Sequence, residues 1–432
     1  MLKVDSSIRL YSLGTLLMFE FTMFLIVIFT VFIFTQSLSA IVNISAKKQF
    51  FAIGLSLICL TTLAQPQPIT LQISYVKFDQ QQASNVLNIF KIPEDSGYTG
   101  AELAINDSNT TGKFLKQHFT LSHFSSEKSD EFLRYLDAKY LQGQQIFILD
   151  APLTELVKVD KWAKNKSLLL FNVSESSDEL RSTQCLAKVF HTSVSNAMKS
   201  DALAQWLLYR RMNKVLLIQG SKVEDIELAH SFKRSAKRFG IKLIGEKQWD
   251  FNTDLRRSTQ QEIPLFTQTV QDYDAVYVAD KSKEFAEFIP FNTYLPRPVI
   301  GSAGLEALAW HGAIEQWGAA QLQNRFTDLA NRAMNETDFS AYLAVRSIAQ
   351  SVHKLHSKDS EKLKEYISSD KFELAAYKGR KLSFRSWNRQ LRMPLALVHP
   401  HALVSQSPQP GMLHPVTELD TLGFDAQESH CK

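Results

Sequence analysis

The sequence predicts an α/β protein built from two parallel sheets, each flanked by helices. Short apolar strands alternate with helical segments along most of the chain, which is the pattern of parallel sheets covered by helices on both faces. Two of these strands, QIFIL at 145–149 and SLLLF at 167–171, are apolar throughout or nearly so, as strands buried on both faces are. The alternation restarts after residue 190, so we expect two such sheets.

The first half of the alternation starts with a strand and then repeats helix and strand. The first helix carries Ala101, Leu103 and Ile105 on its apolar side, and the next carries Phe132 and Leu136 on one face. Pro152 interrupts the chain after a buried strand. We expect strands at 69–75, 119–122, 145–149 and 167–171, and helices at 97–106, 130–140 and 153–164.

The second half repeats the pattern and then changes in kind. Ser195–Arg211 is predicted to be an amphipathic helix, and Gly240 ends the helix that follows it. The last strands are expected to be antiparallel. We expect strands at 214–218, 241–244, 275–279, 298–300, 382–384 and 394–398, and helices at 225–239, from 280 through 288, within 334–355 and at 360–369.

The region 1–64 contains two hydrophobic segments, and the second ends like an export signal. Lys47 and Lys48 precede an apolar run at 50–63, and Thr62-Leu63-Ala64 offers small residues where signal peptidase requires them. The pattern predicts a signal peptide at about 43–64. The mature protein would then begin at Gln65 and reside in the periplasm.

The first hydrophobic segment, Leu16–Phe34, is long enough to cross a bilayer, although it contains Glu20, which is costly in lipid. Two interpretations follow. Either residues 1–42 are an over-long gene start, or the segment is retained as a membrane anchor. We expect the former, because the signal beginning near Asn43 is complete by itself.

Composition narrows the functional classes. The net charge is +4 with acids and bases interspersed, so no block of charge indicates a nucleic-acid partner. The motifs of the common hydrolases and nucleotide-binding enzymes are absent, so we expect neither an enzyme nor a cofactor. His353 and His356 lack a third ligand, and no metal site is expected. Cys59 would leave with the signal, and Cys185 and Cys431 would form one disulfide.

Several segments resemble a known family. GAELAIND at 100–107, KVLLI at 214–218, YDAV at 273–276 and PVIG at 298–301 are similar to motifs of the type I periplasmic solute-binding proteins of ABC importers, the branched-chain amino acid group. The resemblance extends over residues 69–432. A narrower similarity, carried by 95–114, 202–207, 304–326 and 383–409, is to the branch whose genes sit beside PQQ-dependent alcohol dehydrogenase genes.

The resemblance implies two lobes joined by three hinge crossovers. Lobe 1 would comprise residues 66–187 and 317–382, and lobe 2 residues 188–316 and 383–432. A small polar ligand would be trapped between the lobes by hinge closure, and the partner would be an ABC permease in the inner membrane. The alternative is a periplasmic sensor or accessory protein that uses the same fold to signal to a membrane partner.

One departure from the family concerns the loop Asp150–Thr154. The amino acid binders carry a glycine and two hydroxyl residues there, which hold the ligand carboxylate. Here an aspartate takes the place of the glycine, and Pro152 has no N–H to donate. Because Asp150 would repel an anion, we expect Asp150, with Thr154 nearby, to accept a hydrogen bond from a hydroxyl or an amine. The alternative is that Asp150 is only the N-cap of the next helix.

The other candidate ligand-binding residues follow strands or open helices. Each also has a structural interpretation, as a turn former, a helix cap or hinge packing. Ser193 and Ser195 open a helix whose N-terminus can receive an oxygen-rich ligand. The remaining candidates are Asn172, Ser174, Tyr277, Asp280 and Ser302, with Glu306, Trp310 and His311 beside them. A basic helix face formed by Lys233, Arg234, Lys237 and Arg238 is expected to be solvated.

Overall fold

The computed structural model describes residues 68–79, 92–250 and 255–431. The predicted export region and Leu16–Phe34 lie outside these residues. Within them, no helix combines the length and the apolar character needed to span a bilayer.

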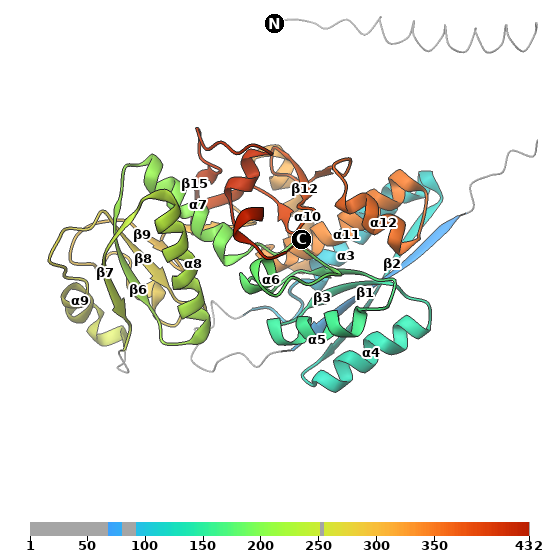
Figure 1. The fold of residues 1–432 in the computed structure, drawn as a ribbon, viewed down its shortest axis with the longest axis horizontal. Helices are drawn as coiled ribbons and strands as arrows, with labels where there is room; N and C mark the ends of the chain where they lie inside the picture. The colour runs from blue at the N-terminus through green and yellow to red at the C-terminus, as the bar shows by residue number, and fades with distance from the viewer. Residues whose placement is uncertain (1–67, 80–91, 251–254, 432) are drawn as a thin grey trace, which may run out of the picture. The chain divides into compact units, whose positions relative to one another are not determined.

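The first sheet has five parallel strands in the order β2-β1-β3-β4-β5. Figure 1 labels β1, β2 and β3 of this sheet. Alternate residues of its strands enter two different cores. Ile146 and Ile148 of β3 pack in the core that contains α3 and α11, whereas Phe147 and Leu149 pack against α4 and α5. The strands are β1 Ile69–Phe78, β2 Gln117–Ser126, β3 Ile146–Asp150, β4 Leu169–Asn172 and β5 Val189–His191. The helices are α3 Tyr98–Leu115, α4 Ser129–Leu141, α5 Leu153–Ala163, α6 Glu179–Ser182, α10 Ala319–Ala330, α11 Glu336–Leu355 and α12 Ser360–Ser368.

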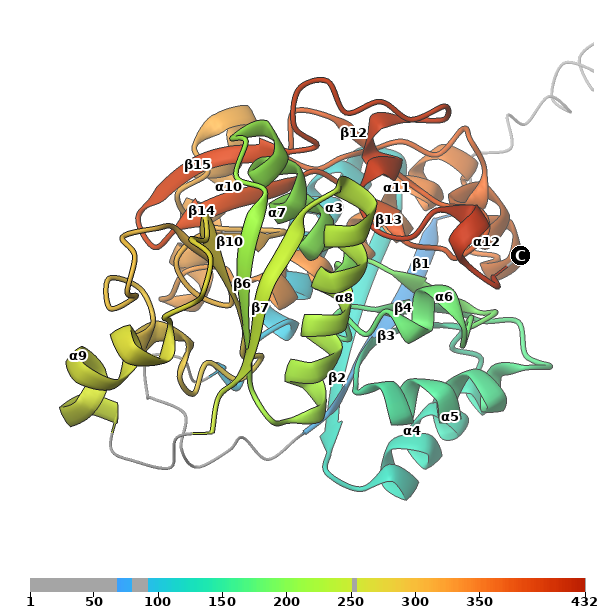
Figure 2. The same cartoon turned by 60° about the vertical axis from the view of Figure 1, so that its left-hand side comes forward.

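The second sheet has four parallel strands in the order β7-β6-β8-β9. Figure 2 shows α8 running beside β6 and β7. Val215 and Leu217 of β6 face the α7 and α8 side, and Leu216 and Ile218 face the side that contains Phe285. The elements are α7 Asn196–Tyr209, β6 Lys214–Gln219, α8 Val223–Phe239, β7 Lys242–Gln248, α9 Leu255–Phe266, β8 Ala275–Ala279 and β9 Val299–Gly301.

Two small antiparallel sheets complete the fold. The order of one is β10-β14-β15, and that of the other is β11-β12-β13. Their strands are β10 Glu306–Leu308, β11 Leu374–Ala375, β12 Lys381–Phe384, β13 Leu391–Arg392, β14 Leu395–His399 and β15 Ala402–Ser407. The prediction of antiparallel strands at 382–384 and 394–398 is therefore confirmed, although the two belong to different sheets.

Most predicted elements are confirmed, and two predictions are wrong. Instead of a helix through Phe288, only the single 3₁₀ turn Ala286–Phe288 follows β8. Helix α7 is buried along nearly its whole length and is not amphipathic, because it lies between α8 and the β10-β14-β15 sheet. No sequence pattern predicted β5, α6, α9, α10 or several of the short strands. Strand β5 pairs with β4, so the first sheet runs to His191, beyond the expected lobe boundary at 187.

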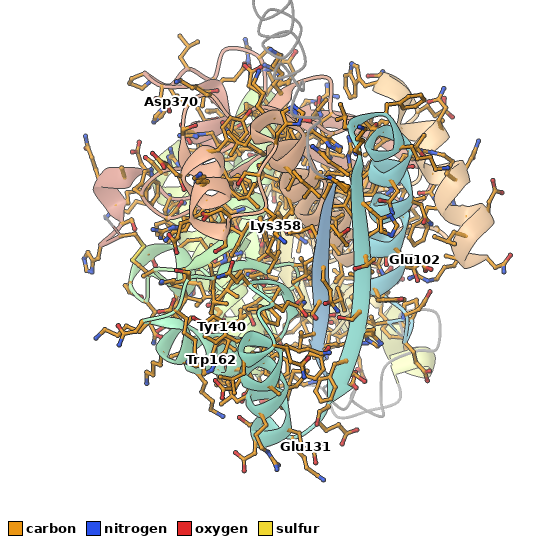
Figure 3. All side chains as sticks on the ribbon, turned by 90° about the vertical axis from the view of Figure 1, so that its right-hand side faces the viewer. Glu102, Glu131, Tyr140, Trp162, Lys358 and Asp370 are labelled. Carbon is orange, nitrogen blue, oxygen red and sulfur yellow. A yellow bond between two sulfur atoms is a disulfide. The ribbon has the colours of Figure 1, made fainter. Side chains whose placement is uncertain are left out.

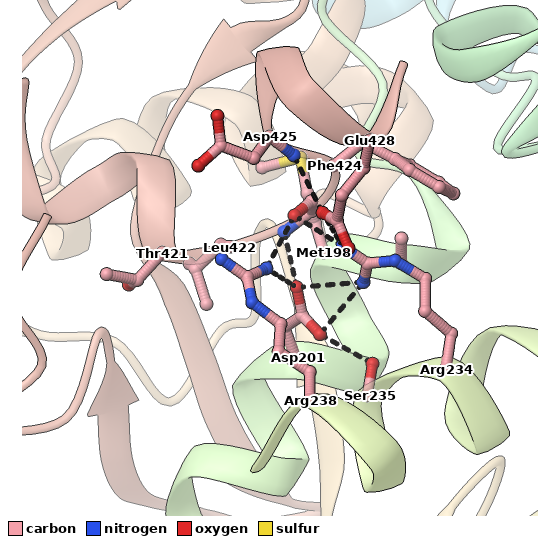
Figure 4. Close-up of polar contacts among 12 residues, drawn as sticks. Met198, Asp201, Arg234, Ser235, Arg238, Thr421, Leu422, Phe424, Asp425 and Glu428 are labelled. Atoms are coloured by element: carbon pink, nitrogen blue, oxygen red, sulfur yellow. Dashed lines mark hydrogen bonds and ion pairs between the residues drawn. The ribbon is translucent and has the colours of Figure 1, made fainter.

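The basic face of α8 is not simply solvated. Arg234 and Arg238 point towards the fully buried carboxylate of Asp201 on α7, at 3.1 and 2.9 Å (Figure 4). Asp201 also accepts from Ser235 Oγ at 2.5 Å and from the backbone N–H of Gly423 at 2.8 Å. These contacts fasten the C-terminal segment to α7 and α8.

The predicted disulfide is confirmed. Cys185 and Cys431, 246 residues apart in sequence, are bonded. The neighbouring Ser429 hydroxyl donates to the backbone oxygen of Arg181 at 3.0 Å. The backbone N–H of His430 donates to the backbone oxygen of Ser182 at 2.7 Å. The segment that binds Asp201 is therefore also tied to the region before β5.

Candidate functional site

The candidate site lies where the strands of the first sheet end. Asp150 is the last residue of β3 and is half-buried. Tyr75, in the neighbouring strand β1, donates a hydrogen bond from its hydroxyl to Asp150 Oδ2 at 2.8 Å. Ser174, which follows β4, lies close enough to Asp150 for its hydroxyl to lower the pKa of that carboxyl. Ligands of open α/β sheets bind at this carboxyl edge.

Burial controls the electrostatics of this pair. It raises the pKa of the Asp150 carboxyl above its ordinary value, and the bonds from Ser174 and Tyr75 oppose that rise. Burial also raises the pKa of Tyr75 well above its ordinary value, and the adjacent Asp150 charge acts in the same direction. Tyr75 therefore stays a neutral donor at physiological pH.

Aromatic rings border Asp150 and Tyr75. The ring of His123 lies 4.8 Å from that of Tyr98 and 5.9 Å from that of Tyr75, measured between centroids. Partial burial, and then the charge of Lys77, lower the pKa of His123, which favours the uncharged imidazole. Gly97 has a φ of 81°, and a Cβ there would lie 1.9 Å from the Tyr75 hydroxyl, so only glycine permits this approach.

Asp150 is not the cap of the helix that follows. The N-cap of α5 is Pro152, which makes no side-chain cap hydrogen bond. The first N–H of the helix, that of Leu153, instead donates to Glu175 Oε2 at 3.0 Å. Thr154 is exposed in the first turn of α5. The capping interpretation of Asp150 is therefore wrong.

Asn172 and Ser193 bind the protein's own backbone. Both side chains are buried. Asn172 Oδ1 accepts from the N–H groups of Ser174 and Glu175, at 3.2 and 2.9 Å, and its Nδ2 donates to Glu175 O at 2.9 Å. Ser193 Oγ donates to the same oxygen at 2.8 Å. Together they fix the loop after β4, whereas Ser174 lies at Asp150.

The backbone N–H groups at the N-terminus of α7 already have hydrogen-bond acceptors within the protein. Ser195 is its N-cap and accepts from the N–H of Met198 at 3.2 Å. The N–H of Asn196 donates to Ser176 O, that of Ala197 to Asp178 Oδ1 and that of Lys199 to Ser195 O. The first four amides of the helix thus have protein acceptors, and the cap-only interpretation of Ser195 fits the structure.

The candidates from the second sheet have protein partners of their own. Tyr277 is buried and stacks on Phe232, with 3.7 Å between centroids, and burial raises its pKa. Asp280 is buried and accepts from the N–H groups of Phe285 and Ala286. Ser302 Oγ accepts from the N–H of Asp280 at 3.0 Å.

The neighbours of these candidates also have protein partners. Glu306 pairs with Lys283 at 2.7 Å, and Trp310 stacks on Phe339 with 4.5 Å between centroids. His311 Nδ1 accepts from the N–H of Ala313 at 3.1 Å. No group of three or more histidine, cysteine, aspartate or glutamate side chains in the described ranges is placed to hold a metal ion.

A surface hollow lies away from Asp150. It measures about 510 Å³ and is lined by Gln72, Gln144 and Lys358, among other residues, where β1 and β3 begin. Figure 3 labels Lys358 beside β1. This is the amino-terminal edge of the sheet, opposite to Asp150, where no candidate ligand-binding residue was predicted.

No family model matches the sequence, and no curated protein is significantly similar to it. Solved structures do match. The closed form of the leucine-, isoleucine-, valine-, threonine- and alanine-binding protein from Brucella ovis is similar with a TM-score of 0.61 and 13% identity, over 77% of this chain and 89% of that one.

The chain has the two-lobe fold of type I periplasmic binding proteins. The branched-chain amino acid transporter substrate-binding protein of Streptococcus pneumoniae, in complex with isoleucine, has a TM-score of 0.58 and 13% identity, over 78% of this chain and 98% of that one. A solute-binding protein of R. palustris in complex with benzoate has a TM-score of 0.56 and 12% identity, over 76% and 92%.

Several side-chain contacts join the part of the fold that contains the first sheet to the part that contains the second. Lys281, just after β8, donates to Ser176 Oγ at 2.6 Å in the loop that follows β4. Ser231 of α8 bonds to Asp178. Lys199 of α7 pairs with Glu336, the first residue of α11, at 2.5 Å. The loop after β4 therefore contacts both Asp150 and the second sheet's helices.

The sequence did not reveal four residues of the site. Tyr75, Tyr98 and His123 come from β1, α3 and β2, and Glu175 from the loop after β4. An aromatic residue near the carboxyl end of β1 was the only available signal for Tyr75, because a buried tyrosine usually has a hydrogen-bond partner. The rings of Tyr98 and His123 meet only once α3 packs beside β2.

Proposed function

We propose that this protein is the substrate-binding component of an ABC importer and captures a small polar solute between its lobes, without covalent chemistry or a cofactor. Its partner would be a permease in the inner membrane. The observation that carries the proposal is the half-buried carboxylate of Asp150 at the sheet edge, held by Tyr75 and uninvolved in helix capping. Its fold supports the proposal, because the matched proteins include ABC transporter binding proteins.

The lobes of the proposal follow the sheets. Lobe 1 contains the five-stranded sheet and lobe 2 the four-stranded sheet, with hinge crossovers after β5, after β10 and between β12 and β14. Asp150 is the proposed ligand contact, with Ser174 beside it. Lys281–Ser176 and Lys199–Glu336 are the contacts expected to change when the lobes open.

The proposed ligand differs in charge from those of the matched proteins. Isoleucine and benzoate each carry a carboxylate. Here a carboxylate of the protein occupies the sheet edge, and like charges in a confined site repel. We therefore propose a neutral or cationic ligand that donates from a hydroxyl or an amine. A link to quinoprotein alcohol oxidation fits a hydroxyl ligand, and adjacent alcohol dehydrogenase, permease and ATPase genes would support it.

A thermal-shift screen tests the proposed function. The panel contains alcohols, polyols, amines, amino acids, carboxylic acids and quinone cofactors. A compound that binds the native state raises the melting temperature, and we expect hits among the alcohols, polyols or amines. If no compound shifts the melting temperature, or if Asp150→Asn leaves the affinity for every hit unchanged, the proposal fails.

Localisation needs a separate test. We propose a periplasmic protein that is processed before Gln65. N-terminal sequencing of the protein from the periplasmic fraction is expected to return Gln65 as the first residue. An intact Met1 in the membrane fraction would reverse this proposal in favour of an anchored protein.

A further inference from the structure

The N-terminus of α5 holds a carboxylate of the protein itself. Helix α5 starts directly beyond Asp150, and its N-cap, Pro152, supplies no side-chain acceptor. Glu175 fills that role from the loop after β4. Its Oε2 accepts from the N–H of Leu153 at 3.0 Å, and its Oε1 accepts from the N–H of Ser177 at 2.7 Å. Free N–H groups and the helix dipole make such a terminus attractive to anions.

The loop after β4 holds the backbone of Glu175 in one position. Four hydrogen bonds hold the backbone around Glu175, namely those of Asn172 to Ser174 N, Glu175 N and Glu175 O, and that of Ser193 to Glu175 O. Asn172 and Ser193 are both buried. Polar side chains that satisfy one another in a buried network fix a single arrangement. Glu175 is therefore placed by the fold and is not a mobile surface acid.

A ligand carboxylate would compete with Glu175 for the same donors. It would also approach Asp150, whose carboxyl lies on the same edge. From this geometry we propose that Glu175 is a specificity-determining residue, which occupies the anion position of α5 and excludes carboxylate ligands. The inference rests on the proposed solute-binding function and names the excluded ligand class.

The test is chemical rescue of a variant that lacks the carboxylate. Glu175→Ala removes the internal anion and leaves the N–H groups of Leu153 and Ser177 without it. We expect the melting temperature of this variant to fall, and acetate at about 50 mM to raise it by roughly 1–3 °C relative to sodium chloride of equal ionic strength. The wild type is expected to respond equally to both salts.

Two further variants keep the test decisive. Glu179→Ala removes a nearby acid that accepts from Gln184 Nε2 at 2.6 Å and does not touch α5, so acetate is expected to have no specific effect on it. Glu175→Gln retains an acceptor and is used if the alanine variant does not fold. It is expected to bind benzoate or leucine more tightly than the wild type does.

The outcomes separate this inference from the proposed function. Acetate-specific rescue of the Glu175 variant supports the inference whether or not a natural ligand has been found. Equal responses of the variant and the wild type to acetate overturn it. Tight binding of benzoate or leucine to the wild type also overturns it, although the protein would then still be a solute-binding protein.

Discussion

The hydroxyl of Tyr75 donates to the carboxylate of Asp150 at 2.8 Å, across two neighbouring parallel strands and 75 residues of sequence. The bond orients Asp150 Oδ2 at the sheet edge. Because Tyr75 is fully buried, the donor cannot turn to solvent. Asp150 is therefore a pre-oriented acceptor, which reduces the entropy that a ligand loses on binding.

Replacing Asp150 by asparagine tests its role as a ligand contact. Asp150→Asn keeps the size and removes the charge, so we expect ligand binding to weaken by roughly 1.5–3 kcal/mol, as for a lost hydrogen bond to a charged group. Calorimetry with a ligand from the screen measures this change. Lys161→Ala, at an exposed position in the last turn of α5, serves as the control and should bind normally. A lowered melting temperature with unchanged affinity would make Asp150 purely structural.

The buried ion cluster on α7 makes a prediction about stability. In Asp201→Asn the charges of Arg234 and Arg238 lose their buried partner, and we expect the free energy of unfolding to fall by about 3–5 kcal/mol. Urea denaturation measures it. The control is Glu428→Gln, which breaks a more exposed pair with Arg234 and should cost about 1 kcal/mol or less. Similar losses in both variants would show that the burial of Asp201 does not strengthen its contribution to the free energy of unfolding.

The buried Lys378 should make the stability of the protein depend on pH. Its side chain is buried, Nζ donates to Ala309 O, and burial lowers its pKa to about 7, against the opposing charge of Glu336. The unfolded chain has an ordinary lysine pKa of about 10.4. Between these values the unfolded state binds the extra proton, so this group makes the protein more stable as pH rises.

Comparison of Lys378→Met with the wild type isolates that contribution. From pH 7.5 to pH 9, the free energy of unfolding of the wild type should rise relative to the variant by about 1.4 kcal/mol for each pH unit. Urea denaturation at the two pH values measures it. Lys381→Met, at an exposed position of the same segment, is the control and should track the wild type. Parallel pH profiles for Lys378→Met and the wild type would contradict a neutral buried lysine.

The disulfide can be tested by the number of free thiols and by the stability of a variant that lacks it. A protein expressed from Gln65 lacks Cys59, so we expect no free thiol in the denatured, unreduced state and two after reduction. Cys431→Ser opens a cross-link between positions 246 residues apart, and the chain-entropy model gives a loss of roughly 5 kcal/mol. Two thiols titrated before reduction would rule the bond out in solution.

Local rules predicted most of the fold and the position of Asp150. QIFIL is a buried strand, so the residue after it lies at a sheet edge. Gly240 was predicted to end α8, and it adopts the left-handed conformation there. Such signals lie within a few residues of one another, and for this reason the sequence alone reveals them.

Pairings across long stretches of sequence were not predictable. The side-chain amide of Asn172 can form hydrogen bonds with a ligand or with the backbone equally well. Which of the two it binds depends on the fold of the loop. The basic residues of α8 form a regular helical face, yet Arg234 and Arg238 bind a carboxylate more than 30 residues earlier on α7. A helix was predicted after β8, where Asp280 instead closes a single turn through its carboxylate.

The bond between Asp201 and Gly423 has a consequence for biosynthesis. The ribosome produces the carboxylate 222 residues before the backbone amide that binds it. Strands β14 and β15, which pack against α7, are also synthesised long after it. A nascent chain that ends before residue 395 therefore exposes apolar surface of α7, and such surface promotes aggregation. We expect the chain to depend on chaperone binding until nearly all of it has been translated.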